Sequence, residues 1–159
     1  MKTTRRYGTK ADLALDMWVK LARAFSVFDR KTVEHIRTFR LTQAQFGVLE
    51  TLGHKGPLKL GELCRKQLVS GGNMTVVVDN LERGGLVERI RSKEDRRSII
   101  VQLTAKGRHL FERIFPQHAQ HVAEVASVLT EGEQTELGML LKKLGIGVVL
   151  KETRGGLKR

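Results

Sequence analysis

The sequence has little of several residue types that mark particular classes of protein. It holds one cysteine and two prolines in 159 residues, and aromatic residues make up only 5%. A single cysteine, Cys64, excludes an internal disulfide and is typical of a protein in a reducing cytoplasm. So few prolines and aromatic residues favour a mainly helical fold over a sandwich or a barrel.

Long apolar stretches are also missing. No run reaches the length needed to cross a bilayer, and the basic start M-K-T-T-R-R-Y-G-T-K has no apolar segment behind it that would indicate a secretory signal. We therefore expect a cytoplasmic protein without a membrane partner. Its length suits one domain that buries its own core.

Positive charge is in excess, with a formal net charge of +12. The two ends carry part of it, because residues 1–10 contain four basic and no acidic side chains and residues 151–159 contain four basic and one acidic. The rest lies mainly in the middle third, where residues 54–110 hold twelve basic and six acidic side chains. This asymmetry favours a polyanionic partner, with DNA or RNA ahead of an anionic membrane surface.

Apolar residues at spacings of three and four predict a series of helices. Thr42 and Gln45 form a capping box at the start of the second helix, and Thr130 and Glu133 form another at the start of the last. Gly53 is expected to end the second helix and Gly84-Gly85 the fourth. The expected helices cover residues 11–38, 42–53, 60–68, 70–83, 105–128 and 130–150.

Between the fourth and fifth helices, residues 86–91 and 98–103 read as two strands of a hairpin. Thr104 is the expected cap of the helix after the hairpin, and Pro116 is expected to kink or break that helix. Residues 1–10 form a basic N-terminal segment, and residues 151–159, K-E-T-R-G-G-L-K-R, look like a disordered basic tail.

This order of elements is that of a winged helix-turn-helix, in which the second of two short helices enters the DNA major groove. The start of that helix carries residues suited to such contacts. Glycines allow a phosphate or base edge to come close, Asn can pair with adenine, Thr can bond a base or phosphate, and an outward Val can contact a thymine methyl. The candidate major-groove residues are Ser70, Gly71, Gly72, Asn73, Thr75 and Val76.

The same helix has no lysine or arginine between Ser70 and Glu82. Bidentate contacts from arginine to guanine are therefore not expected from it. We expect half-sites rich in A and T.

Three blocks of sequence resemble the MarR family of bacterial transcriptional regulators. They are L-T-Q-A-Q-F-G-V-L-E, then N-M-T-V-V-V-D-N-L-E-R-G-G-L-V, then D-R-R-S-I-I-V-Q-L-T-A-K-G. The resemblance implies a mainly α (α+β) fold: a winged helix-turn-helix over residues 41–104, with a three-element wing region, inside a single domain of residues 11–150. Helices over 11–40 and 105–150 would intertwine in a homodimer that binds a pseudo-palindrome in double-stranded DNA, more often as a repressor.

The resemblance also implies roles for particular residues. The family's D-x-R pattern at the wing tip falls on Asp95 and Arg97, where the arginine enters the minor groove and the acid braces it. With Lys93 and Arg96 these form the candidate wing contacts. Trp18, Phe25 and Phe28 would border a pocket for a phenolic or quinone-like effector, or else belong to the dimer core.

Other functions leave weaker signals. Cys64, beside Arg65 and Lys66, is a candidate redox sensor, although a lone cysteine on a half-apolar helix is usually a small core residue. His118 and His121 are a candidate metal pair without further ligands, and exposed helical histidines are commoner. No catalytic constellation or cofactor motif is present, so we expect neither an enzyme nor a cofactor. The alternative is a basic nucleic-acid-binding protein, architectural or RNA-binding, with little sequence preference.

Overall fold

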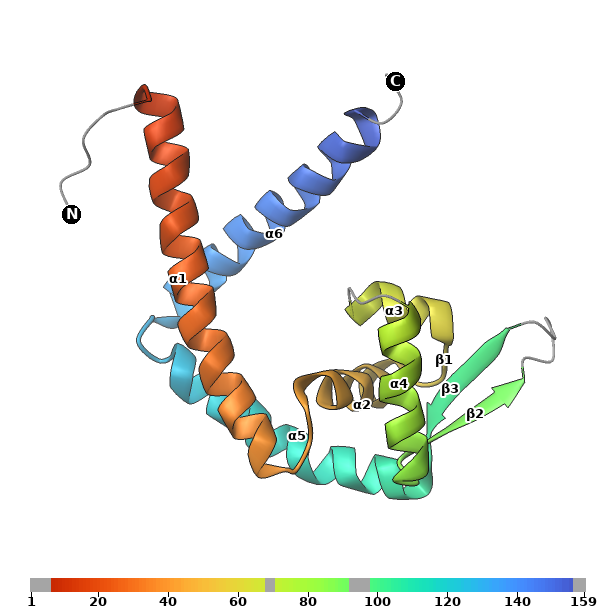
Figure 1. Cartoon of the computed structure of the whole chain (residues 1–159). Coiled ribbons are helices and arrows are strands. Elements are labelled where there is room, and N and C mark those ends of the chain that lie inside the picture. Colours follow the sequence, from red (N-terminus) through yellow and green to blue (C-terminus); the bar gives the residue numbers. More distant parts are fainter. Residues whose placement is uncertain (1–6, 68–70, 92–97, 156–159) are drawn as a thin grey trace. The chain divides into compact units, whose positions relative to one another are not determined.

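A computed structural model describes residues 7–67, 71–91 and 98–155 of the chain (Figure 1). The chain forms two compact units, residues 1–121 and 122–159. Most of the described chain is helical, as expected, and three strands form one small antiparallel sheet. The expected boundaries of the dimerisation helices, residues 11–40 and 105–150, stay a prediction.

Apart from one added short strand, the first unit contains the expected order of helices and strands. Its elements are α1 (Thr9–Thr38), α2 (Gln43–Lys55), β1 (Leu58–Lys59), α3 (Leu60–Gln67), α4 (Gly71–Arg83), β2 (Val87–Arg91), β3 (Ile99–Leu103) and the first part of α5 (Ala105–Ala126). Figure 1 shows α2, α3 and α4 gathered beside the β2–β3 hairpin. This is the winged helix-turn-helix that the sequence predicts.

The start of α2 confirms the predicted capping box. The Gln45 amide donates to Thr42 Oγ1 at 3.2 Å, and the Thr42 amide donates to Gln45 Oε1 at 2.9 Å. The predicted end at Gly53 is wrong, because α2 continues to Lys55 and Gly56 takes the capping position with a φ of 76°. Gly53 is instead a packing site, since a Cβ there would lie 2.5 Å from the Phe111 ring.

The core lies among α2, α3, α4, β2, β3 and the facing parts of α1 and α5. It is built from Ile36, Leu41, Phe46, Val48, Leu49, Leu52, Leu63, Met74, Val78, Leu81, Val87, Val101 and Ile114. From α4 it takes Met74, Val78 and Leu81, a stripe at helical spacing, while Val77 is partly buried against it. The run of three valines is therefore helical, because one face of the helix is buried.

The hairpin confirms the two predicted strands, each of which begins one residue later than expected. β3 lies in the middle of the sheet, paired with β2 through Val87–Leu103 and Arg91–Ile99 and with β1 through Leu58–Val101. The sequence did not predict β1, because a strand of two residues is too short to show alternation.

The connection from α4 into β2 confirms the predicted stop at Gly84-Gly85. The helix ends at Arg83, and Gly85 has a φ of 68°, which favours glycine. Thr104 then caps α5 by accepting from the Gly107 amide at 3.0 Å, and its hydroxyl donates to the Gly85 carbonyl at 2.7 Å. The Thr104 side chain therefore links the start of α5 to the turn that follows α4.

The long helix α5 runs through Pro116 to Ala126. Of the two alternatives expected at Pro116, the break is wrong and the kink stays a prediction, and the helix ends two residues earlier than expected. Proline removes one helical hydrogen bond, but Ile114 is buried and Phe115 packs against the core, so tertiary packing holds this part of the helix.

The second unit contains the end of α5 and α6 (Glu131–Gly155). The predicted capping box is confirmed, since the Thr130 amide donates to Glu133 Oε2 at 2.8 Å and the Glu133 amide donates to Thr130 Oγ1 at 3.3 Å. The Thr130 hydroxyl also donates to Glu133 Oε2, at 2.9 Å, and the two bonds that the carboxylate accepts from Thr130 lower the pKa of Glu133. The prediction of disorder from residue 151 is wrong for residues 151–155, because α6 continues to Gly155.

Apolar side chains stay exposed on α6 and on α1. On α6 they include Leu137, Leu140, Leu141 and Leu144, and on α1 they include Leu13, Leu15, Trp18 and Phe25. Across the described ranges, neither of these helices nor any other is both long and apolar enough to cross a membrane.

Candidate nucleic-acid interface

The first two turns of α4 form an exposed surface with little side-chain bulk. Asn73, Thr75 and Val76 are exposed, and Val76 keeps 59% of its surface open. This confirms that Val76 points away from the buried stripe. The structure thus brings five of the six predicted major-groove residues together, while Ser70 lies outside the described residues.

Gly71 and Gly72 are not required by the fold. Neither has a positive φ, and a Cβ at either position would have no neighbour within 4 Å. Glycine costs about 1 kcal/mol relative to alanine inside a helix. Two glycines at exposed positions with open space around them would let a partner molecule come close to the helix backbone, where a side chain would prevent it.

The hydroxyl of Thr75 is already used inside the helix, where it donates to the Gly71 carbonyl at 3.0 Å. Its oxygen can still accept a hydrogen bond. In this rotamer it suits a base amino group better than a phosphate, because a phosphate oxygen needs a donor.

The described part of the wing is the pair of strands β2 and β3, which pair as far as Arg91 and Ile99. Lys93, Asp95, Arg96 and Arg97 lie outside the described residues, and their contacts with DNA stay predictions.

The structure adds Arg89, which the sequence pattern did not single out. Its Nη2 lies 2.5 Å from Asp79 Oδ1 and donates to the Thr75 carbonyl at 3.3 Å, and its Nη1 donates to the Glu82 carboxylate. The Arg89 amide donates to the same carboxylate at 3.0 Å. One residue of β2 therefore contacts α4 at three positions along the helix.

Alternation along β2 could have revealed Arg89. Val87 is buried and Glu88 and Ile90 are exposed, so Arg89 shares a face with Val87. An arginine on the inward face of a strand needs an acidic partner. The two acids of α4, Asp79 and Glu82, are those partners.

A hollow of about 300 Å³ lies beside α1, α2 and α5. It is lined by Phe25, Phe28, Asp29, Thr32, Ile36, Gln43, Phe46, Gly47, Glu50, Gln67 and His118. Phe25 and Phe28 were predicted for an effector pocket. Trp18 is 60% exposed and is not among the residues around this hollow.

The polar groups in this hollow are acidic or neutral, and its described lining contains no lysine or arginine. Gln43 Nε2 donates to Asp29 Oδ1 at 2.8 Å, and Gln67 Nε2 donates to the Gly47 carbonyl at 2.9 Å. Burial raises the pKa of Glu50, against a smaller opposite effect of His54. An anion bound there would therefore meet two carboxyl groups without a lysine or arginine to balance them.

His118 lines the hollow and belongs to a cluster of aromatic rings. The centroid of its ring lies 4.5 Å from that of Phe46 and 5.6 Å from that of His35. The His35 ring in turn stacks on the His121 ring, with 4.2 Å between their centroids. Burial, followed by the charges of His35 and His121, lowers the pKa of His118. Within the described residues, no group of three or more potential ligands is placed to hold a metal ion.

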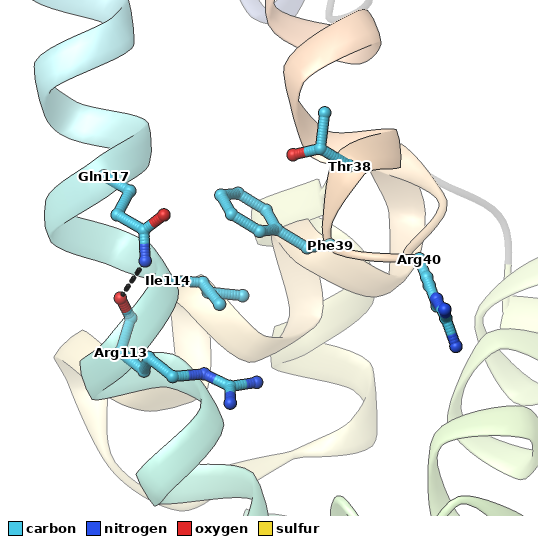
Figure 2. A pocket seen from close by; sticks show the side chains of 6 residues that line it. All are labelled: Thr38, Phe39, Arg40, Arg113, Ile114 and Gln117. Atoms are coloured by element: carbon cyan, nitrogen blue, oxygen red, sulfur yellow. Dashed lines mark hydrogen bonds between the residues drawn. The ribbon is translucent and has the colours of Figure 1, made fainter.

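A second hollow, of about 430 Å³, has the opposite charge. Figure 2 shows it between the end of α1 and the middle of α5, lined by Thr38, Phe39, Arg40, Arg113, Ile114 and Gln117. Both arginines are exposed, and Arg40 has a φ of 60°.

Cys64, the candidate sensor, is partly buried and packs against the core of the first unit.

Known proteins are similar to this chain in sequence and in fold. The MarR family model matches residues 41–99. The HTH-type transcriptional regulator MhqR of Bacillus subtilis is 38% identical over 84% of this chain and 92% of its own length.

Two solved structures show the same fold with a partner bound. A cysteine-to-serine variant of MarR from Escherichia coli, complexed with operator DNA, has a TM-score of 0.71 and 28% identity over 81% of this chain and 96% of its own. NadR in complex with 4-hydroxyphenylacetate has a TM-score of 0.70 and 22% identity over 91% of this chain and 97% of its own. With 38% identity to a curated regulator along most of its length, the chain belongs to the MarR family of HTH-type transcriptional regulators.

Proposed function

We propose that the protein is a homodimeric repressor that binds a pseudo-palindromic operator, with α4 in the major groove and the wing in the minor groove. The observation that carries this proposal is the outward face of α4, where two glycines without a structural need lie beside Asn73, Thr75 and Val76. The E. coli relative in complex with operator DNA supports it. A cytoplasmic location is part of the same proposal, because a bacterial regulator meets its operator there.

Selection of bound sequences from random double-stranded DNA tests this proposal. We expect a symmetric site with two A/T-rich half-sites about 34–36 Å apart, one turn of DNA. Asn73→Ala should cost about 1–3 kcal/mol at one base position in each half-site. Enrichment of no sequence, together with equal binding to RNA, would instead support the alternative of a sequence-tolerant basic protein.

We further propose that a small effector enters the hollow beside Phe25 and Phe28 and releases the DNA. The bound 4-hydroxyphenylacetate of the NadR structure supports a response to aromatic compounds. Since Asp29 and Glu50 line this hollow without a lysine or arginine among its described residues, we propose a neutral phenol or quinone as the ligand rather than an aromatic acid.

The test compares DNA release by hydroquinone, benzoquinone and 4-hydroxyphenylacetate, using the wild-type protein and the selected duplex. Release by the neutral compounds alone supports the assignment. Release only by the aromatic acid would contradict it and would direct attention to the hollow with Arg40 and Arg113. Phe28→Ala should weaken the response without changing the DNA affinity of the free protein.

A further inference from the structure

We propose that Arg89 masks the negative charge of Asp79 and Glu82, so that the second half of α4 can lie beside DNA phosphates. Arg89 would thus be a positioning residue for DNA binding, although it need not touch DNA itself. This inference rests on the proposed placement of α4 in the major groove. It assigns a function to an arginine that contacts both acids of this helix.

The two acids lie on the side of α4 that carries a candidate DNA contact. Thr75, Asp79 and Glu82 are separated by four and three residues, so they lie along one side of the helix. Thr75 is the candidate contact at the start of this line. The acids therefore continue the side of the helix on which contact with DNA is expected.

Both acids reach the solvent. The side chains of Asp79 and Glu82 remain 47% and 40% exposed, whereas that of Arg89 is 20% exposed. The two carboxylates thus extend into solvent from a more buried arginine behind them. Carboxylates in such a place would repel the phosphates of a DNA molecule lying along the helix.

The helix does not balance these charges by itself. Among the residues of α4, Asp79 and Glu82 are the only acids and Arg83 is the only base. Arg83 Nη2 donates to the Asn80 side chain at 3.0 Å, and no ion pair joins Arg83 to either acid within the described chain. Arg89 supplies the compensating charge from β2, at hydrogen-bonding distance to both carboxylates.

The competing role for Arg89 is purely structural, with its contacts only holding β2 against α4. The two roles differ in the expected effect of removing all three charges together. Charge compensation by Arg89 becomes unnecessary once Asp79 and Glu82 are neutral. A purely structural contact between Arg89 and α4 is lost whether or not the two acids are neutral. They differ also in salt dependence, because repulsion between exposed charges is screened by salt and a change of shape is not.

The experiment measures the affinity of the full-length protein for the duplex selected by the wild type, by fluorescence anisotropy, over a range of salt concentrations. We expect Arg89→Gln to weaken binding about tenfold near 0.1 M salt, with a deficit that shrinks as salt rises. Asp79→Asn/Glu82→Gln should bind at least as tightly as the wild type. The triple variant Arg89→Gln/Asp79→Asn/Glu82→Gln should return to near the wild-type affinity.

Lys31→Gln is the matched control, because it removes the same charge from an exposed ion pair with Glu34 on α1. It should change affinity much less than Arg89→Gln. Thermal unfolding of every variant shows which proteins are folded, and Arg89→Lys, which keeps the charge, provides a second test that should retain most of the affinity. Unchanged binding by Arg89→Gln, or a triple variant as weak as Arg89→Gln, would overturn the masking role.

Asn73→Ala and Val76→Ala separate this inference from the proposed function. If they weaken or alter binding while Arg89→Gln does not, α4 is the DNA-reading helix and only the masking role fails. If neither Asn73→Ala nor Val76→Ala affects DNA binding, the placement of α4 in the groove fails, and the masking role fails with it.

Discussion

Gly107 shows how one residue fixes the junction between the wing and α5. A Cβ at this position would collide with the Leu86 carbonyl oxygen, which already accepts a hydrogen bond from the Thr104 amide. Backbone atoms that are bonded in this way cannot easily move aside. Gly107 is therefore required by the fold, in contrast to Gly72.

We predict that Gly107→Ala lowers the free energy of unfolding by at least about 1–3 kcal/mol, the usual cost of overpacking. Gly72→Ala is the matched control, because a Cβ there has open space. It should leave stability equal or slightly higher and weaken DNA binding instead. Urea denaturation and DNA titration of both variants check the contrast, and equal stability of the two would contradict it.

His118 makes stability depend on pH. Its pKa lies below the ordinary 6.5 because burial, and then the charges of His35 and His121, disfavour the imidazolium. As the pH falls through 6.5 the unfolded chain takes up this proton before the folded one does, so the free energy of unfolding decreases until the pH passes the folded pKa. Stability contributed by neutral His118 is thus present above this window and lost below it.

We predict that His118→Gln flattens the fall in stability below pH 6.5. His109→Gln is the control, since His109 is exposed on the same helix. The measurement is urea denaturation at a series of pH values for both variants and the wild type. An unchanged slope in His118→Gln would mean that other groups cause the acid sensitivity.

Single residues of the candidate site were partly predictable. Asn73, Thr75 and Val76 stand out because their polarity or outward position conflicts with a role in the core. Arg89 was missed because its importance depends on Asp79 and Glu82, which are brought to it by the fold of a different element. His118 was weighed as a metal ligand or as an exposed helical histidine, and its place in the ring cluster was missed because its neighbour His35 is distant in the sequence.

At the scale of elements, α2 depends on its capping box. Thr42 and Gln45 satisfy each other's backbone amides at the point where the chain leaves α1. We predict that Thr42→Ala lowers the free energy of unfolding by about 1 kcal/mol. Thr42→Ser, which keeps the hydroxyl, should cost much less, and urea denaturation of the two variants compares them.

Elements were predictable where the local signal was strong. Capping boxes and apolar stripes predicted α1, α2, α4 and α6 to within a few residues. The end of α2 was misplaced because Gly53 serves packing against Phe111, which cannot be read from neighbouring residues. β1 was missed because it exists only through its pairing with β3.

At the scale of the whole molecule, exposed apolar side chains on α1 and α6 indicate a partner surface. The leucines at 137, 140, 141 and 144 form a helical stripe that is exposed along α6. A second copy of the chain is the partner that we propose. Its presence would bury this stripe and bring two copies of α4 into register with the two half-sites.

We predict that the wild-type protein is a dimer in solution and that Leu140→Glu shifts it toward the monomer. Lys142→Gln, two residues away and on the opposite side of α6, makes the same change in net charge and should remain dimeric. Light scattering coupled to size-exclusion chromatography, at several protein concentrations, distinguishes the two. A fully dimeric Leu140→Glu would place the dimer interface elsewhere.

The exposed Val76 has a consequence for chemically modified DNA. A valine contacts the methyl group at C5 of a pyrimidine, and it would make the same contact with 5-methylcytosine as with thymine. Uracil in place of thymine at the contacted position should therefore weaken binding, and methylation of a cytosine placed there should restore it. Binding to an operator with such a position would then report on the methylation of the chromosome as well as on its sequence.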